Sequence, residues 1–301
     1  MPASLVQSER RPLGPDLEVG PLSFGCWRFT GSSVSDDRAV LEAALDLGMD
    51  LIDTADVYGL DWGGSGFGAN EEALGRVLAD GPGLRDRMVL ATKAGIAPPV
   101  PYDSSPEYLT AACEASLRRL GVERIDLYLI HRPDLFTHPA RVAETLTGLR
   151  QAGKIGEVGV SNHTPAQTDA LQRHLPFALV ADQPQYSVLH LDPLRDGTFD
   201  RCLREDVVPL AWSPLAGGRV ATGDGVRPEL LGVLDRLAER EGVSRTAVAV
   251  AFVLAHPSAP VAIVGSQRPD RLADAASALG VSLDRSDVYE IIQASDGEPL
   301  P

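Results

Sequence analysis

The segment Asp-Leu-Ile-Asp-Thr-Ala-Asp-Val-Tyr, residues 50–58, gives the strongest indication of the fold. A short apolar run ends at Asp53, and Tyr58 follows shortly after it, at the edge of a glycine-rich stretch. Lys93 and His131 each come directly after another short apolar run of the same kind. A parallel barrel collects the residues that follow its strands at one mouth, so this pattern predicts a polar site there.

Short apolar runs alternate with amphipathic segments along the whole chain. The expected strands cover residues 22–25, 50–53, 88–93, 125–130, 155–161, 178–182, 207–212 and 261–264. Runs of this length are typical of parallel strands that are buried on both faces. We therefore expect the 301 residues to form one α/β domain over residues 1–301, a (β/α)8 TIM barrel. A doubly wound sheet is the alternative.

Helices are expected between these strands. Residues 36–47 carry apolar side chains at helical spacing after Ser35, which is expected to cap that helix. A Ser-Pro pair opens the segment 106–120, and a Thr-Pro pair at 164–165 opens another. Residues 229–241 carry an apolar stripe, and residues 245–255 are almost wholly apolar, so the latter helix is expected to be buried.

Composition excludes several classes of function. The formal net charge is −15, so binding to nucleic acid or to an acidic membrane surface is not expected. Apolar runs stay far below the ~20 residues of a membrane span, and residues 1–20 lack a signal-peptide core. The three cysteines show no CxxC pair, and the histidines show no metal-ligand spacing. We expect a cytoplasmic protein without a metal; no pattern indicates its oligomeric state.

Polar residues also follow the later strands. Residues 63–68, Gly-Gly-Ser-Gly-Phe-Gly, look like a dinucleotide-binding loop, but they follow Tyr58 and not a first strand, so we expect a loop at the mouth. The residues with hydrogen-bonding groups near the ends of the fifth to eighth strands are Ser161, Asn162, Gln183, Trp212, Ser213, Gly265 and Ser266.

Several local sequences match one known family. They are Asp-Thr-Ala-Asp-Val-Tyr (53–58), Asn-Glu-Glu-Ala-Leu-Gly (70–75), Thr-Lys (92–93), the segment 117–134 that ends in His-Arg-Pro-Asp, Gly-Lys-Ile-Gly-Glu-Val-Gly-Val-Ser-Asn (153–162) and Trp-Ser-Pro-Leu (212–215). In this order, they make the chain resemble the aldo-keto reductases over nearly its full length. The segments 164–167 and 265–272 resemble bacterial members in particular.

The resemblance implies a catalytic tetrad of Asp53, Tyr58, Lys93 and His131. Chemistry supports these roles independently. A carbonyl that receives a hydride needs a proton donor, and an unperturbed tyrosine, with a pKa of ~10, is slow in that role near neutrality. The ammonium of Lys93 would lower the pKa of Tyr58, and Asp53 would hold Lys93 in its charged form. A neutral His131 would orient the carbonyl oxygen.

The resemblance also implies a nicotinamide cofactor, which supplies the hydride that no side chain can give. NADP(H) is the expected cofactor, and NAD(H) is not excluded, because Gly265 stands where many members have lysine and Asp274-Ala275 where they have Glu-Asn. The implied contacts are Ser161, Asn162 and Gln183 to the carboxamide, Trp212 stacked on the ring, Ser213, Leu215 and Gly217 around the pyrophosphate, and Ser266, Arg271 and Arg268, with Gly265 beside them, at the 2′-phosphate.

The expected reaction is the reduction of an aldehyde or ketone to an alcohol, or the reverse. Trp27, Phe29 and Trp62 are candidates for the wall of the substrate pocket, although each is equally well explained as loop packing. Variable loops build such pockets, so the sequence indicates a small carbonyl compound and no single substrate. One alternative is a binding subunit that senses the cofactor with little turnover. Another is a lyase that forms a Schiff base on Lys93.

Overall fold

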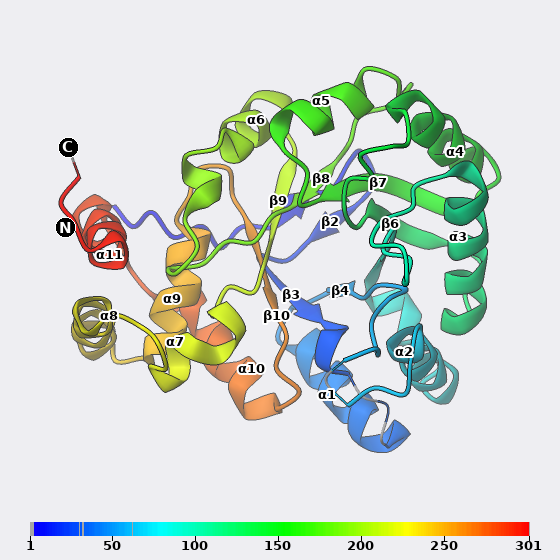
Figure 1. Cartoon of the computed structure of the whole chain (residues 1–301). Helices are drawn as coiled ribbons and strands as arrows, with labels where there is room; N and C mark the ends of the chain where they lie inside the picture. Colours follow the sequence, from blue (N-terminus) through cyan, green and yellow to red (C-terminus); the bar gives the residue numbers. More distant parts are fainter. Residues whose placement is uncertain (1–2, 30, 32, 62, 301) are drawn as a thin grey trace.

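The computed structural model describes residues 3–29, 31, 33–61 and 63–300, and these residues form a closed barrel of parallel strands. Helices surround the barrel (Figure 1). The strands are β3 (Leu22–Gly25), β4 (Leu51–Asp53), β5 (Val89–Ala94), β6 (Ile125–Ile130), β7 (Ile155–Ser161), β8 (Ala181–Gln183), β9 (Val208–Trp212) and β10 (Val261–Val264). The barrel closes where Leu22 of β3 pairs with Ala262 of β10, which confirms the (β/α)8 prediction and excludes the doubly wound sheet.

The helices lie close to the expected positions. They are α1 (Val34–Asp46), α2 (Ala69–Asp80), α3 (Pro106–Leu120), α4 (Pro139–Gln151), α5 (Pro165–Gln172), α6 (Thr198–Glu205), α7 (Arg219–Thr222), α8 (Pro228–Glu241), α9 (Arg245–Leu254), α10 (Pro269–Ala276) and α11 (Arg285–Asp296). Thr164 and Gln167 form a reciprocal capping box at the start of α5. The prediction that Ser35 caps α1 is wrong, because α1 begins at Val34, two residues before the expected start, and the hydroxyl of Ser33 accepts from Asp36 N.

One strand is shifted from its expected position. Residues 178–182 were the expected strand, but β8 covers Ala181–Gln183. The amide of Gln172 donates to Phe177 O at 2.8 Å and accepts from Leu179 N at 2.8 Å. These bonds hold the first part of the apolar run in an irregular connection, so the strand begins later and includes Gln183.

Apolar side chains fill the inside of the barrel and the layer between barrel and helices. Inside, residues from different sides of the barrel, such as Leu51, Leu127 and Leu210, belong to one cluster and have no exposed surface. Eight consecutive residues of α9, 247–254, are buried, as its apolar sequence predicts. A short hairpin of β1 (Arg11–Pro12) and β2 (Glu18–Val19) adds Leu13 and Val19 to the inner cluster, so it covers the end of the barrel where the strands begin.

Candidate active site

A buried lysine lies at the centre of the site. Lys93 has no exposed surface. Its Nζ donates to Asp53 Oδ2 at 2.8 Å, to the backbone oxygen of Thr54 at 2.8 Å, and to Tyr58 Oη at 3.1 Å. The three protons of an ammonium are therefore matched by three oxygen acceptors, which fixes the position of the charge.

Strand pairing places these groups together. Asp53, at the end of β4, is opposite Ala91 of β5, and Lys93 lies two residues further along β5 on the same face. The loop after β4 is attached to β5, because Asp56 N donates to Lys93 O at 3.0 Å. A turn closed by Tyr58 N and Ala55 O, at 3.2 Å, then directs the phenol back towards the lysine.

The charges of this group influence one another. Burial alone would lower the pKa of Lys93, but the charge of Asp53 and the hydrogen bonds of the site outweigh it and leave the pKa above its usual value. Burial raises the pKa of Tyr58, and the nearby Lys93 lowers it without cancelling the rise. Lys93 thus acts on Tyr58 in the expected direction, but the net shift is upward because the phenol lies in a desolvated place. Tyr58 is therefore a protonated donor at neutral pH.

His131 completes the group at the end of β6. Its ring packs edge-on against the ring of Tyr58, with centroids 5.7 Å apart. Burial, and then the charges of Lys93 and Arg132, lower the pKa of His131 well below its usual value. The imidazole is therefore neutral, and one ring nitrogen carries a proton that is available to an acceptor. The other residues that the structure describes leave Nδ1 without a hydrogen-bond partner.

A chain of hydrogen bonds leads from this group to Trp212. Gln183 Nε2 donates to Asp53 Oδ1 at 2.8 Å, and Ser161 Oγ donates to the backbone oxygen of Gln183 at 2.9 Å. Asn162 Nδ2 donates to Ser161 Oγ at 2.7 Å, and Trp212 Nε1 donates to Asn162 Oδ1 at 3.0 Å. The residues expected to hold a nicotinamide carboxamide and to stack on its ring are thus brought together beside the tetrad.

The connection after β9 has the open backbone that a phosphate group needs. Gly217 and Gly218 have φ of 72° and 101°, and no atom lies within 4 Å of where a Cβ would be. Ser213 also has a positive φ of 56°, and its Oγ accepts from Gly217 N at 2.9 Å. Leu215 lies within this turn, where its backbone oxygen accepts from Gly218 N. Glycine at such positions lets a ligand approach the main chain closely, so the turn fits a pyrophosphate.

Two arginines lie at the start of α10. Arg268 pairs with Asp270 at 2.5 Å, and its backbone nitrogen donates to Ser266 Oγ at 3.3 Å. Arg271 is exposed, and its guanidinium has no hydrogen bond or ion pair with the rest of the described chain. Gly265 precedes them directly after β10, and the nearest atom to where its Cβ would be is Gly25 O, at 3.9 Å. A phosphate beside the beginning of a helix and a guanidinium is well matched, so these residues fit the adenosine end of NADP(H).

The three candidates for the substrate wall have different positions. Trp27 is 37% exposed and donates from Nε1 to Asp61 Oδ1 at 3.1 Å, so it stands at the mouth. Phe29 has no exposed surface and packs edge-on against Phe24, with ring centroids 6.2 Å apart, so its place in the substrate wall stays a prediction. Trp62 lies outside the described residues.

A second buried polar cluster lies behind the tetrad and was not singled out from the sequence. Asp56 is fully buried, and burial followed by the charge of Glu71 raises its pKa to about 8. Tyr108 Oη lies 3.2 Å from Asp56 Oδ2. Glu71 accepts from Thr92 Oγ1 at 2.6 Å and from Arg119 Nε at 2.7 Å. Both acids occur within the family-like segments, but their partners are distant in sequence, so no spacing rule connects them.

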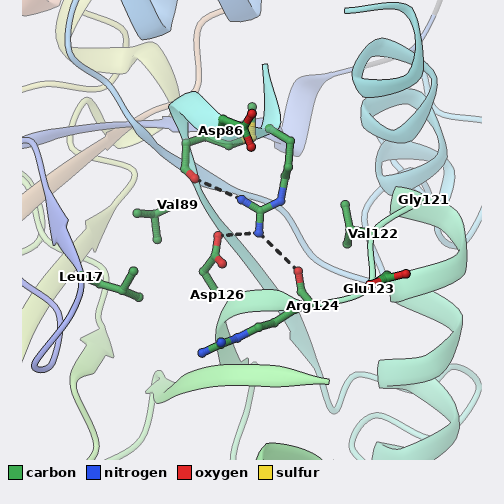
Figure 2. A pocket seen from close by; sticks show the side chains of 10 residues that line it. Leu17, Asp86, Val89, Gly121, Val122, Glu123, Arg124 and Asp126 are labelled. Atoms are coloured by element: carbon green, nitrogen blue, oxygen red, sulfur yellow. Dashed lines mark hydrogen bonds and ion pairs between the residues drawn. The ribbon is translucent and has the colours of Figure 1, made fainter. Parts of the chain in front are cut away.

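Two hollows are prominent in the surface. The larger, of about 530 Å³, is lined by residues such as Leu17, Val89 and Asp126 (Figure 2). It lies where β5 and β6 begin, the opposite end from the tetrad, and Arg85 within it already donates to Asp126, Met88 and Arg124. The smaller, of about 310 Å³, includes Asn162 and Trp212. Active sites of this fold lie at the end where the strands finish, so the smaller hollow belongs to the candidate site.

Other types of site are not indicated in the part of the chain that the structure describes. Within it, no group of three or more His, Cys, Asp or Glu side chains is arranged to hold a metal ion. No helix among the same residues has the length and apolar character needed to cross a membrane.

Comparisons with known proteins agree with this fold. A 6-dehydroglucose reductase from Novosphingobium aromaticivorans is 44% identical over 95% of this chain and 94% of its own length. Among solved structures, the glycerol dehydrogenase from Gluconobacter oxydans is 29% identical, with a TM-score of 0.82 over 98% of this chain and 97% of that one.

An aldo/keto reductase from Klebsiella pneumoniae, solved in complex with NADP and acetate, is 26% identical, with a TM-score of 0.79 over 98% of this chain and 97% of that one. All three similar proteins come from bacteria. The sequence model of the aldo/keto reductase family matches residues 21–296. With the barrel and its buried Lys93 group, these matches show that the chain belongs to the aldo/keto reductase family, a family of oxidoreductases.

Proposed function

We propose that this protein reduces aldehydes or ketones to alcohols with NADP(H), and that Tyr58 is the proton donor. The observation that carries the proposal is the group formed by Lys93, Asp53 and Tyr58, with Nζ 2.8 Å from the carboxylate and 3.1 Å from the phenol. Such a group serves a reaction in which negative charge develops on a carbonyl oxygen next to the phenol.

Each residue has a distinct task. When bound, the nicotinamide ring supplies the hydride that the carbonyl carbon receives. Tyr58 gives its hydroxyl proton to the carbonyl oxygen, and Lys93 stabilises the phenolate until solvent returns a proton. The neutral imidazole of His131 donates to the same oxygen and orients it. Asp53 keeps Lys93 charged and in place.

Preference for NADP(H) over NAD(H) is supported by Arg271, whose exposed guanidinium is not engaged by the described residues. Arg268 contributes less, because Asp270 already neutralises it. Gly265 provides no cation. We therefore expect a preference that depends on one arginine and that is moderate in size, with NAD(H) accepted more weakly.

The substrate that we propose is an aldehyde derived from a sugar. The support is the identity of 44% over 95% of the chain to a protein named 6-dehydroglucose reductase. The smaller hollow beside Asn162 and Trp212, which is lined largely by polar residues, suits such a compound better than an apolar one. A location in the cytoplasm stays a prediction from the sequence.

The alternatives have less support. A Schiff-base lysine needs a depressed pKa and access to substrate, whereas Lys93 is fully buried and has a raised pKa. A binding subunit that senses the cofactor has no need for a complete tetrad. Borohydride added with an aldehyde should leave Lys93 unmodified, which separates the lyase from the reductase.

Steady-state NADPH oxidation with a panel of aldehydes and ketones tests the proposal. We expect turnover with reactive aldehydes, and a higher kcat/KM for a sugar-derived aldehyde than for an unsubstituted one. NADPH that binds tightly but is not oxidised with any carbonyl compound would favour the binding subunit instead.

A further inference from the structure

The smaller hollow, which we call the side pocket, is a cavity of about 310 Å³ near the tetrad. The residues of its wall that matter here are Arg132, Asn162, His190, Asp192, Asp196 and Trp212. Its volume is at the lower end of the range of roughly 300–1,000 Å³ that is typical of small-molecule sites. The side pocket is thus large enough for part of a small substrate.

The side pocket adjoins the reacting group. Arg132 directly follows His131, and its charge is close enough to lower the pKa of that imidazole. Asn162 Nδ2 is 3.5 Å from the backbone oxygen of His131. Trp212, the expected partner of the nicotinamide ring, forms another part of the wall. A carbonyl compound at Tyr58 would therefore have the side pocket within reach of its remaining atoms.

Arg132 offers hydrogen-bond donors to the side pocket. Arg132 is partly buried, and its guanidinium donates to none of the residues that the structure describes. Most other arginines that lie near carboxylates in this chain are paired, as Arg119 is with Glu71. An arginine that lines a cavity with its donors uncommitted is suited to binding a ligand.

Asp192 offers acceptors on the same cavity. Its side chain is 72% exposed, and its only ion pair within the described chain is a long one of 3.6 Å to His190 Nε2. A carboxylate only accepts hydrogen bonds and a guanidinium only donates them, whereas a hydroxyl group does both. A wall that combines the two suits several neighbouring hydroxyl groups.

We propose that the side pocket binds the hydroxyl groups of a neutral, polyhydroxylated aldehyde, with Arg132 donating and Asp192 accepting hydrogen bonds. This inference rests on the reductase function proposed above and names the residues that select its substrate. The chemical class is a short sugar or a sugar-derived aldehyde without a charged group.

The charges of the side pocket exclude a phosphorylated substrate. Asp192 and Asp196 together outnumber the single cation of Arg132. The carboxylate of Asp196 accepts from Thr198 N at 2.8 Å, which holds it in place beside the side pocket. The whole chain has a formal net charge of −15, which adds to the repulsion of anions. We therefore expect Arg132 to donate hydrogen bonds to hydroxyl groups and not to a phosphate.

The test compares glyceraldehyde, glyceraldehyde 3-phosphate and butyraldehyde at saturating NADPH. Variants Asp192→Ala and Arg132→Met should each lower kcat/KM for glyceraldehyde by ~10-fold or more relative to butyraldehyde, mainly through KM. Asp192→Asn keeps an acceptor but removes the charge, so it should improve kcat/KM for glyceraldehyde 3-phosphate relative to glyceraldehyde. Asp86→Ala, which removes an exposed carboxylate at the opposite end of the barrel, is the matched control and should leave every ratio unchanged.

The outcomes separate the inference from the function beneath it. If the ratio of kcat/KM for glyceraldehyde to kcat/KM for butyraldehyde is the same in all variants, the role of the side pocket is overturned. The proposed reductase activity is unaffected by that result. Weaker NADPH binding with unchanged ratios would assign the side pocket to the cofactor and equally overturn the inference. A wild type that reduces no carbonyl compound would instead contradict the proposed function. Thermal unfolding of each variant checks that a lower kcat/KM does not come from a misfolded chain.

Discussion

Gln183 donates a hydrogen bond of 2.8 Å from Nε2 to Asp53 Oδ1 across the inside of the barrel. The two residues lie on β8 and β4, which are on opposite sides of the closed ring of strands. Gln183 is also a candidate for holding the nicotinamide carboxamide. The bond therefore links the carboxylate that fixes Lys93 to the residue that would position the cofactor.

Replacing Gln183 with Leu should affect both functions together. The loss of a buried hydrogen bond to a charged group costs about 1.5–3 kcal/mol of folding stability, because Asp53 Oδ1 loses its donor. NADPH should bind more weakly and kcat should fall. Urea unfolding and NADPH titration measure the two effects. Gln172→Leu, which removes another amide with two backbone bonds, is a control that should change stability and leave kcat alone.

Tyr58→Phe should remove nearly all carbonyl reduction. The phenol is the only proton donor that Lys93 touches in the described chain, and general acid catalysis contributes about 10²–10⁴-fold to the rate. NADPH should still bind, because the hydroxyl is not expected to contact the cofactor. Single-turnover kinetics and a cofactor titration test this. Retention of most of kcat with a simple aldehyde would show that the tetrad assignment is wrong.

Lys93→Met should shift the pH profile and weaken the fold. Lys93 lowers the pKa of Tyr58 against the effect of burial, so its removal should raise that pKa further. The part of the pH–rate profile that reports the ionisation of Tyr58 should therefore move to higher pH. Asp53 would also be left buried without its cation, at a cost of about 3–5 kcal/mol. A pH–rate profile and a denaturant titration are the measurements. An unchanged pH–rate profile would mean that Lys93 does not alter the pKa of Tyr58.

Arg271→Ala should weaken NADPH far more than NADH. The guanidinium would form charge-assisted hydrogen bonds with the 2′-phosphate, which NADH lacks. The difference between the two cofactors should shrink as salt rises, because the site is exposed and screened. Quenching of Trp212 fluorescence is a direct readout. Equal losses for both cofactors would instead assign Arg271 to the pyrophosphate or to the fold.

Asp56→Asn should stabilise the protein increasingly as pH rises. Burial raises the folded pKa of Asp56 to about 8, above the unfolded value of ~3.9, so the folded state holds a proton that the unfolded state has released. Wild-type stability therefore falls between about pH 4 and pH 8, and the neutral amide avoids this loss. We expect a gain on the order of a few kcal/mol at pH 8 and almost none at pH 4.

Urea midpoints of wild type and Asp56→Asn at several pH values check the sign. Asp182 has a pKa raised by burial to about 7 and titrates in part of the same window, so only the difference between the two proteins reports Asp56. A difference that stays constant with pH would show that Asp56 is already ionised in the folded state.

The sequence predicts the fold well because local patterns carry it. Seven of the expected strands overlap the observed ones closely, and β8 differs because the side chain of Gln172 competes for its first residues. The Lys93 group was predictable because each member lies at or shortly after the carboxyl end of a short apolar run that forms a strand. The link from Gln183 to Asp53 was not, since its residues are 130 positions apart and only closure of the barrel brings them together. The same holds for the cluster around Asp56.

The pairing of β3 with β10 has a consequence for how the chain is made. Leu22 is synthesised well before its partner Ala262, and the two cannot pair until Ala262 has emerged from the ribosome. Until then, β3 and the growing end of the sheet have unpaired edges, which are prone to join with other chains. Pairing between strands that are so far apart in the sequence also slows the last step of folding. We therefore expect the yield of active protein to depend on translation speed and on the supply of chaperones.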